Sequence, residues 1–269
     1  MDNRPIGVFD SGVGGLTVVN ALVQSISSET IYYVGDTARV PYGNKSRERI
    51  QQYSEEIIDW LIKKDCKMVI VACNTASSLA IDYLKKKFSL PIIGVIDPVV
   101  QLAISRTKSQ SIGVIGTHAT IQSNSYGEKL KVIRPKINIL NQSCPLFVPL
   151  VEEGLTSGPI TKLIVESYLS HFKNTDVDTL ILGCTHYPIL TAVIKDVVGK
   201  NISLVDSGKA TAEVVMDVLK KNGILSEESN GGVHSFVTDS KQSFQKVITK
   251  ALTPEINISI KSINRIDIG

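Results

Sequence analysis

The chain has 269 residues, of which 43% are hydrophobic and 20% charged, the composition of a globular protein with one large domain or two modest ones. Its 29 basic and 26 acidic side chains give a formal net charge of +3 and are spread along the sequence, which does not favour a nucleic-acid-binding protein. No apolar run approaches the roughly 18 residues that a membrane-spanning helix needs, and the start of the chain lacks the pattern of a secretory signal, so we expect a cytoplasmic protein with no membrane contact.

Short runs rich in Val and Ile alternate with longer stretches of helical period, which predicts an α/β fold with a mostly parallel sheet. A helix is expected between the second and third strands, where Ile50, Tyr53, Ile57 and Leu61 recur at spacings of three and four residues and face the core. The three lysines at residues 85–87 are expected at the solvated end of another helix. The predicted strands are residues 6–10, 31–35, 68–72, 92–95, 112–115, 179–183, 202–205 and 235–238.

Two stretches of the first half recur in the second half. Residues 6–11 (IGVFDS) resemble residues 112–117 (IGVIGT), and residues 68–75 (MVIVACNT) resemble residues 179–186 (TLILGCTH). The similar offsets indicate a duplicated α/β unit, although parallel strands in general resemble one another. We therefore expect two similar doubly wound parallel-sheet domains related by a pseudo-twofold axis, with the active site in the cleft between them.

The domain boundaries are expected in ordinary loops, because no Gly/Pro/Ser-rich linker separates the halves. We predict crossings near residues 97–98 and 206–208. The first domain then comprises residues 1–97 plus 208–269, and the second comprises residues 98–207.

Polar residues follow the predicted strands at four places, and parallel sheets bind ligands beyond the carboxyl ends of their strands. Their hydroxyls, amides, acid and thiols suit a small zwitterion. These residues are Asp10 and Ser11, then Cys73, Asn74 and Thr75, then Thr117 and Thr120, and finally Cys184, Thr185 and His186.

The two thiols at these strand ends are the candidate acid and base. Cys73 and Cys184 each stand where a strand gives way to a predicted helix, and a helix N-terminus lowers the pKa of a thiol. Two facing thiols suit a reaction in which one removes a proton from carbon and the other returns a proton to the opposite face, inverting the configuration. Cys66 and Cys144 are expected to be structural, and the spacing of the four cysteines favours neither zinc binding nor, in the cytoplasm, disulfides.

The stretch Asp10 to Gly15 (DSGVGG) has the glycines of a phosphate-binding loop, but Thr17 stands where the third glycine of GxGxxG belongs. A tight turn that presents Asp10 and Ser11 is therefore favoured over nucleotide binding. Asp10 itself is either a turn residue or an active-site acid, and its place after a central strand favours the active site. His186 lies close enough to Cys184 in sequence to adjust that thiol or assist proton transfer.

Taken together, these stretches resemble the aspartate/glutamate racemase family. The resemblance implies interconversion of L- and D-glutamate for peptidoglycan synthesis, and hence for cell-wall biogenesis and cell shape, with no PLP, other cofactor or metal. It implies that Cys73 serves the D-isomer and Cys184 the L-isomer, and that the enzyme is a homodimer. The motifs that carry it are residues 9–16 (FDSGVGGL), 35–36 (GD), 41–43 (PYG), 72–76 (ACNTA) and 183–188 (GCTHYP).

The resemblance also implies further site residues. Catalysis would involve Asp10 and His186 beside the two thiols, and an auxiliary acid would fall on Glu152, with its neighbour Glu153 as the alternative. The substrate contacts would be Asp10, Ser11, Tyr42, Gly43, Asn74, Thr75, Thr185 and His186, with Thr117 and Thr120 as additional candidates.

Two other functions remain open from the residues alone. A thiol hydrolase or acyltransferase would use Cys184 as nucleophile and His186 as base, but it leaves Cys73 unexplained and lacks an evident orienting acid. A two-domain binding protein would sense an amino acid in the cleft without turning it over.

Overall fold

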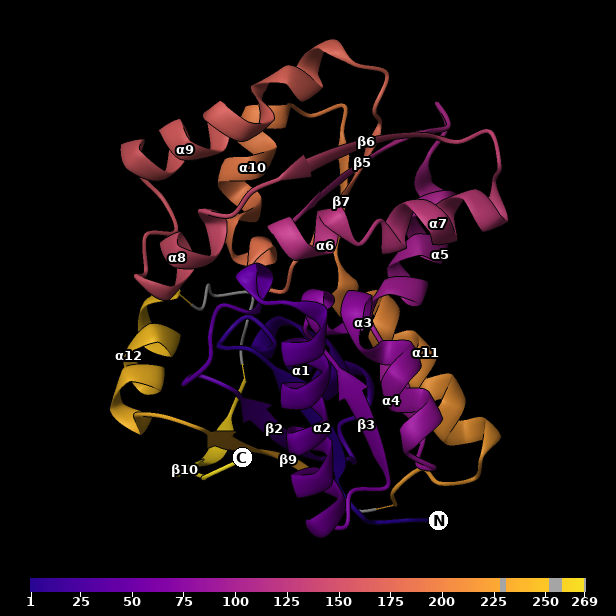
Figure 1. Cartoon of the computed structure of the whole chain (residues 1–269), viewed down its shortest axis with the longest axis vertical. Coiled ribbons are helices and arrows are strands. Elements are labelled where there is room, and N and C mark those ends of the chain that lie inside the picture. Colours follow the sequence, from indigo (N-terminus) through magenta and orange to yellow (C-terminus); the bar gives the residue numbers. More distant parts are fainter. Residues whose placement is uncertain (228–230, 252–257, 269) are drawn as a thin grey trace.

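The computed structural model describes residues 1–227, 231–251 and 258–268, and its strands form two separate sheets (Figure 1). The larger sheet has the strand order β10-β9-β2-β1-β3-β4, and every neighbouring pair is parallel. Its strands are β1 (Ile6–Asp10), β2 (Thr30–Gly35), β3 (Met68–Val71), β4 (Ile92–Gly94), β9 (Gly232–Val237) and β10 (Ile260–Arg265).

The smaller sheet has the order β6-β5-β7-β8 and is also parallel throughout. Its strands are β5 (Ser111–Gly116), β6 (Asn138–Ser143), β7 (Thr179–Gly183) and β8 (Ser203–Val205). The predicted fold class, two parallel-sheet α/β domains, is therefore confirmed.

Helices surround both sheets, and the ribbon shows the smaller sheet with its helices above the larger one (Figure 1). The helices associated with the larger sheet are α1 (Leu16–Ser25), α2 (Arg47–Lys63), α3 (Asn74–Leu79), α4 (Ile81–Lys87), α11 (Ser207–Lys221) and α12 (Lys241–Ala251). Those associated with the smaller sheet are α5 (Ile96–Arg106), α6 (His118–Gln122), α7 (Ser125–Ile133), α8 (Phe147–Glu152), α9 (Pro159–Leu169) and α10 (Thr191–Val198).

Each sheet is buried on both faces, which explains why its central strands are apolar without interruption. In β1, the side chains of Ile6 and Val8 join a core shared with α1 and α11, while that of Phe9 joins the core beneath α2. Helix α2 covers the sheet as predicted, because Ile50, Ile57 and Leu61 are fully buried; Tyr53 is only half-buried. The lysines at residues 85–87 lie exposed in the last turn of α4, also as predicted.

Two edge strands, β6 and β10, were not predicted from the sequence. The strand predicted at residues 235–238 is the end of β9, which pairs with β2 in the larger sheet. None of the helices in the described part of the chain is both long and apolar enough to cross a lipid bilayer.

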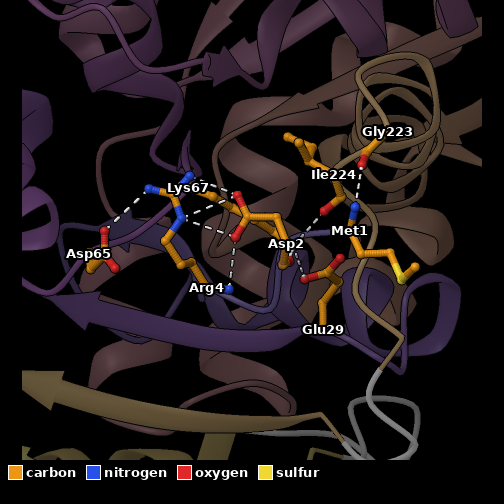
Figure 2. A network of polar contacts seen from close by, with 8 residues as sticks. All are labelled: Met1, Asp2, Arg4, Glu29, Asp65, Lys67, Gly223 and Ile224. Atoms are coloured by element: carbon orange, nitrogen blue, oxygen red, sulfur yellow. Dashed lines mark hydrogen bonds and ion pairs between the residues drawn. The ribbon is translucent and has the colours of Figure 1, made fainter.

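A buried ion pair ties the start of the chain to the larger sheet's lower end (Figure 2). Lys67 Nζ lies 2.6 Å from Glu29 Oε2, and both side chains are fully buried. The same ammonium donates to the carbonyls of Asp2 (2.6 Å) and Ile224 (2.8 Å). Glu29 Oε1 accepts from the amide of Ser226 at 2.8 Å. The network thus joins the N-terminal residues, the sheet and the segment after α11.

Candidate active site

The carboxyl ends of strands from both sheets converge on one small cavity. Since a loop follows each strand at this end, the polar side chains that follow five strands, β1, β2, β3, β5 and β7, meet there, as expected for parallel sheets. Most of the predicted site residues line the cavity: Ser11, Tyr42, Gly43, Cys73, Asn74, Thr75, Thr117, Cys184, Thr185 and His186.

Three predicted residues, Asp10, Thr120 and Glu152, do not line the cavity but contact residues that do. Two lining residues were not predicted, Pro41 and Val148. Pro41 belongs to the motif at residues 41–43 that includes the predicted Tyr42, so the sequence indicated this segment although not Pro41 itself. Val148 is an apolar residue of α8, and nothing in its chemistry or spacing distinguishes it from a core residue.

The two thiols reach this cavity from different sheets. Cys73 follows β3 and is 5% exposed, while Cys184 follows β7 and is 6% exposed. Only Cys73 directly precedes an α-helix, the short α3; Cys184 is followed by a 3-10 turn at Tyr187–Leu190. The sequence-based expectation that a strand gives way to a helix near Cys184 holds, but the helical stretch begins three residues later, as the 3-10 turn that leads into α10.

The electrostatics at Cys73 also differ from the sequence-based expectation. Burial raises the pKa of the Cys73 thiol well above its usual value, and the nearby charges of Asp10 and Cys184 raise it further. Hydrogen bonds from the backbone amides of Ala76 and Thr75 lower the pKa, as the helix start predicts, but burial outweighs them. The protonated thiol is therefore the favoured form of Cys73 in this site.

Cys184 has a different set of neighbours. Its Sγ lies 3.8 Å from Nδ1 of His186, whose Nε2 lies 2.6 Å from Oε1 of Glu152. Burial alone would lower the pKa of His186, but its contacts with Cys184 and Glu152 raise that pKa well above its usual value. Burial raises and the imidazole lowers the pKa of Glu152, with a net lowering. The result is a thiol, imidazole and carboxylate in one chain of contacts.

The neighbouring acid, Glu153, takes no part in this chain. It follows the last residue of α8 and is exposed, whereas Glu152 ends the helix and turns toward His186. Of the two acids that the sequence left open, Glu152 is the one that contacts a residue lining the cavity.

Asp10 links the two halves of the molecule. Its Oδ1 accepts a hydrogen bond from the hydroxyl of Thr185 at 3.0 Å, and its Oδ2 accepts one from the amide of Gly12 at 3.0 Å. The residue therefore closes the turn after β1 and also holds the hydroxyl of Thr185, which lines the cavity.

The glycine-rich loop after β1 packs directly against the second half. A Cβ atom on Gly14 would lie 2.4 Å from His186 Nδ1 and 2.6 Å from Thr185 Oγ1, so only glycine fits there. A Cβ atom on Gly12 would lie 2.5 Å from Glu152 Oε1. The glycines thus allow this loop to meet the imidazole and carboxylate closely, in keeping with a tight turn rather than a nucleotide loop.

Three threonine hydroxyls form a buried triangle beside the cavity. Thr75 lies 3.0 Å from Thr117 and 3.2 Å from Thr120, and the last two are 3.0 Å apart. Nearby, Tyr42 donates its hydroxyl to Asp36, and burial together with that carboxylate raises the pKa of Tyr42. The Tyr42 proton is therefore held by Asp36, and the hydroxyls that can donate to an anionic ligand in the cavity are those of Thr75 and Thr117.

The two cysteines assigned structural roles are buried away from the cavity lining. Burial raises the pKa of Cys66 to about 12 and raises that of Cys144 as well, so both remain neutral thiols. Within the described ranges, no group of three or more His, Cys, Asp or Glu residues is arranged to hold a metal ion.

The sequence profile of the Asp/Glu/hydantoin racemase family matches residues 6–215. A glutamate racemase from Geobacter metallireducens is 45% identical over 245 residues, which cover 91% of each chain. A glutamate racemase from Persephonella marina is 46% identical over 261 residues, covering 97% of this chain and 98% of the relative.

Solved structures agree with this similarity. A glutamate racemase isoform from Bacillus anthracis superposes with a TM-score of 0.93 at 36% identity, covering 99% of this chain and 98% of that one. A glutamate racemase from Francisella tularensis, solved in complex with D-glutamate, has a TM-score of 0.90 at 36% identity with the same coverage.

Proposed function

This chain belongs to the Asp/Glu/hydantoin racemase family, and we propose that it interconverts L- and D-glutamate by proton transfer at the α-carbon between the thiols of Cys73 and Cys184. The observation that carries the proposal is that both thiols line one cavity, each from a different sheet. The glutamate racemases among its relatives, one of them bound to D-glutamate, support the choice of substrate.

The proposed reaction exchanges one proton for another. With L-glutamate, the thiolate of Cys184 takes the α-proton, and the thiol of Cys73 donates its proton to the opposite face of the carbon. Cys184 ends as a thiol and Cys73 as a thiolate, so D-glutamate reacts through the reverse transfer. The contact between His186 Nδ1 and Cys184 Sγ at 3.8 Å supports this assignment, because it places a second group that can exchange a proton beside the sulfur.

The substrate itself would complete the electrostatics of the cavity. Its α-ammonium group, placed near Asp10 and Cys73, would offset the charge and burial that raise the pKa of Cys73. Its carboxylates would accept hydrogen bonds from the hydroxyls of Thr75, Thr117 and Thr185 and from backbone amides. Such preorganised donors in a site shielded from water stabilise the developing carbanion. The proposed substrate contacts are Asp10, Ser11, Tyr42, Gly43, Asn74, Thr75, Thr117, Thr120, Thr185 and His186.

The cellular role follows from the product. We infer that the enzyme works in the cytoplasm without PLP, other cofactor or metal, supplies D-glutamate for peptidoglycan and hence for cell-wall biogenesis and cell shape, and acts as a homodimer. We also propose that its first domain comprises residues 1–97 plus 208–269 and its second residues 98–207. The pairing of β9 with β2 supports the return of the chain to the first domain.

Isotope exchange tests the proposed reaction. Purified protein incubated with L-glutamate in D₂O, with neither PLP nor metal added, should yield D-glutamate that carries α-deuterium, measured by polarimetry and NMR. Aspartate is run beside glutamate to test the substrate. Cys73→Ala and Cys184→Ala should each abolish racemisation in both directions, because either change interrupts the proton path. If the unmodified protein shows neither inversion nor exchange, the proposal is overturned.

A thiol hydrolase is the second candidate function, and one observation favours it. Glu152 hydrogen-bonds His186, which contacts Cys184, so the orienting acid that the sequence did not reveal is present. This alternative predicts that an acyl group can be trapped on Cys184 and that Cys73→Ala is fully active. The racemase proposal predicts neither, and it also accounts for Cys73.

A further inference from the structure

The side-chain amide of Asn74 is held by two hydroxyl groups that lie outside the cavity lining. Its Nδ2 donates to Tyr126 Oη at 2.7 Å and to Ser207 Oγ at 3.1 Å. All three residues are buried, with exposures of 2% for Asn74, 2% for Tyr126 and 4% for Ser207. Both protons of the amide nitrogen are therefore used, and its orientation is fixed.

The other end of this amide has no protein partner. Asn74 Oδ1 is buried without a hydrogen bond, and Asn74 lines the cavity beside Cys73. A buried carbonyl without a donor is costly, so the oxygen is suited to a ligand that brings one. Since an oxygen acceptor cannot bind a carboxylate, the group of an α-amino acid that fits is the ammonium.

We propose that Tyr126 and Ser207 are positioning residues, which hold the amide of Asn74 so that its oxygen accepts a hydrogen bond from the α-ammonium group of the substrate. The inference rests on the proposed function and adds two residues to it. Without the two hydroxyls, the amide is free to turn over and present its N–H groups to the ammonium, which repel it.

The three residues come from three separate parts of the chain. Asn74 begins α3 after β3 of the larger sheet, Tyr126 lies in the first turn of α7 beside the smaller sheet, and Ser207 begins α11 where the chain returns. A second bond, from Ser125 Oγ to the carbonyl of Ser78 at 3.1 Å, holds the start of α7 against the same region. The orientation of Asn74 thus depends on both halves of the molecule.

Burial supports the same arrangement by keeping the phenol neutral. It raises the pKa of Tyr126, and the charges of Cys184 and Cys73 raise it further, while hydrogen bonds to Asn74 and Ser207 lower it. A neutral hydroxyl accepts from the amide and still has a proton to donate.

The test compares two ligands that differ in the ammonium group. Tyr126→Phe, Ser207→Ala and the double variant are assayed for the KM of glutamate and for the Ki of glutarate, a competitive dicarboxylate without an ammonium. Each single variant should raise the KM by about three- to tenfold, the double variant by more, and the Ki should stay within about twofold. The two isomers are mirror images with an equilibrium constant of one, so kcat/KM must fall equally in both directions.

Two further variants separate positioning from packing. Ser207→Thr keeps the hydroxyl and should retain a KM near that of the unmodified enzyme. Tyr168→Phe removes a tyrosine hydroxyl from α9, outside the cavity lining, and should change neither constant.

The outcomes distinguish this inference from the proposed function. An unmodified enzyme that fails to racemise glutamate overturns both. An active enzyme whose double variant keeps the original KM, or whose KM and Ki rise by the same factor, overturns only the positioning role of Tyr126 and Ser207. Thermal melting of each variant checks that it is folded.

Discussion

The imidazole of His186 lies between the thiol of Cys184 and the carboxylate of Glu152, and contacts with both favour its protonated form. In the Glu152→Gln variant the carboxylate charge is lost, so the pKa of His186 should fall and the imidazolium should lose its proton at a lower pH. We expect the alkaline limb of the kcat/KM profile to move to lower pH. The value at pH 8 should fall by about tenfold or more, as for loss of an assisting acid or base.

The adjacent glutamate provides the control for this change. Glu153→Gln removes the same charge from an exposed position that no described contact joins to His186, so its pH profile should match that of the unmodified enzyme. Equal profiles for both glutamine variants would contradict the role assigned to Glu152.

For single residues, the sequence predicted which side chains lie close together but not their pKa values. Cys73, Cys184 and His186 were predicted because strand ends of parallel sheets meet, which depends on topology alone. The raised pKa of Cys73 was not predicted, because it depends on how deeply the loops bury the thiol. The choice between Glu152 and Glu153 depends on where α8 ends, and boundaries are the least predictable feature of a helix.

Among the elements, the loop between β1 and α1 packs so closely against the site that a single added methyl group would clash with it. Gly14→Ala would bring a methyl group to 2.4 Å from the His186 ring and displace that ring from Cys184. We expect kcat/KM to fall by about a hundredfold, since small misplacement of a reacting group has effects of that size. Activity assays and thermal melting measure the two consequences separately.

Gly158 is the matched control, because an added Cβ there would strain the backbone without touching the site. Its φ of +93° strains any other residue, but nothing lies within 4 Å of an added Cβ. Gly158→Ala should therefore lower the free energy of unfolding by about 1 kcal/mol or more and leave kcat/KM unchanged. If Gly14→Ala instead resembles Gly158→Ala, with lost stability and full activity, the loop does not position His186.

Both strands missed by sequence analysis, β6 and β10, lie at sheet edges, whereas the edge strands β4 and β8 were predicted. β6 and β10 are half-exposed or exposed along their length and carry polar residues such as Asn141 and Gln142, so no apolar run indicates them. The internal repeat contained a signal for β6 that the apolar runs lack. β1 resembles β5 in sequence, and β1 is followed along the chain by β2, the strand that pairs with it. By analogy, a strand that pairs with β5 is expected to follow β5, and β6 is that strand.

Across the whole molecule, the two sheets share one strand order. In the larger sheet β2-β1-β3-β4 run side by side, and in the smaller sheet β6-β5-β7-β8 do so, each in the order second, first, third and fourth along its half. The sequence repeats coincide with β1 and β5 and with β3 and β7. A duplicated unit explains why Cys73 and Cys184 follow equivalent strands, and hence why one cavity receives two similar thiols.

One buried side chain joins segments around the larger sheet that are far apart in sequence, namely Asp2, Lys67 and Ile224. It is that of Lys67, whose ammonium has Glu29 and two backbone carbonyls as its partners (Figure 2). Lys67→Met would leave the Glu29 carboxylate buried without its counter-charge. We expect the free energy of unfolding to fall by about 3 to 5 kcal/mol, measured by urea denaturation.

A second substitution distinguishes lost packing from an uncompensated charge. In Lys67→Met/Glu29→Leu both charges are gone, so the double variant should be more stable than Lys67→Met alone, since apolar replacement of a whole buried pair is often nearly neutral. Asp65→Asn removes an exposed partner of Arg4 from the same network and should change stability by less than about 1 kcal/mol. Equal losses in the single and double variants would mean that the Lys67 contacts with Asp2 and Ile224, rather than the paired charges, hold these segments together.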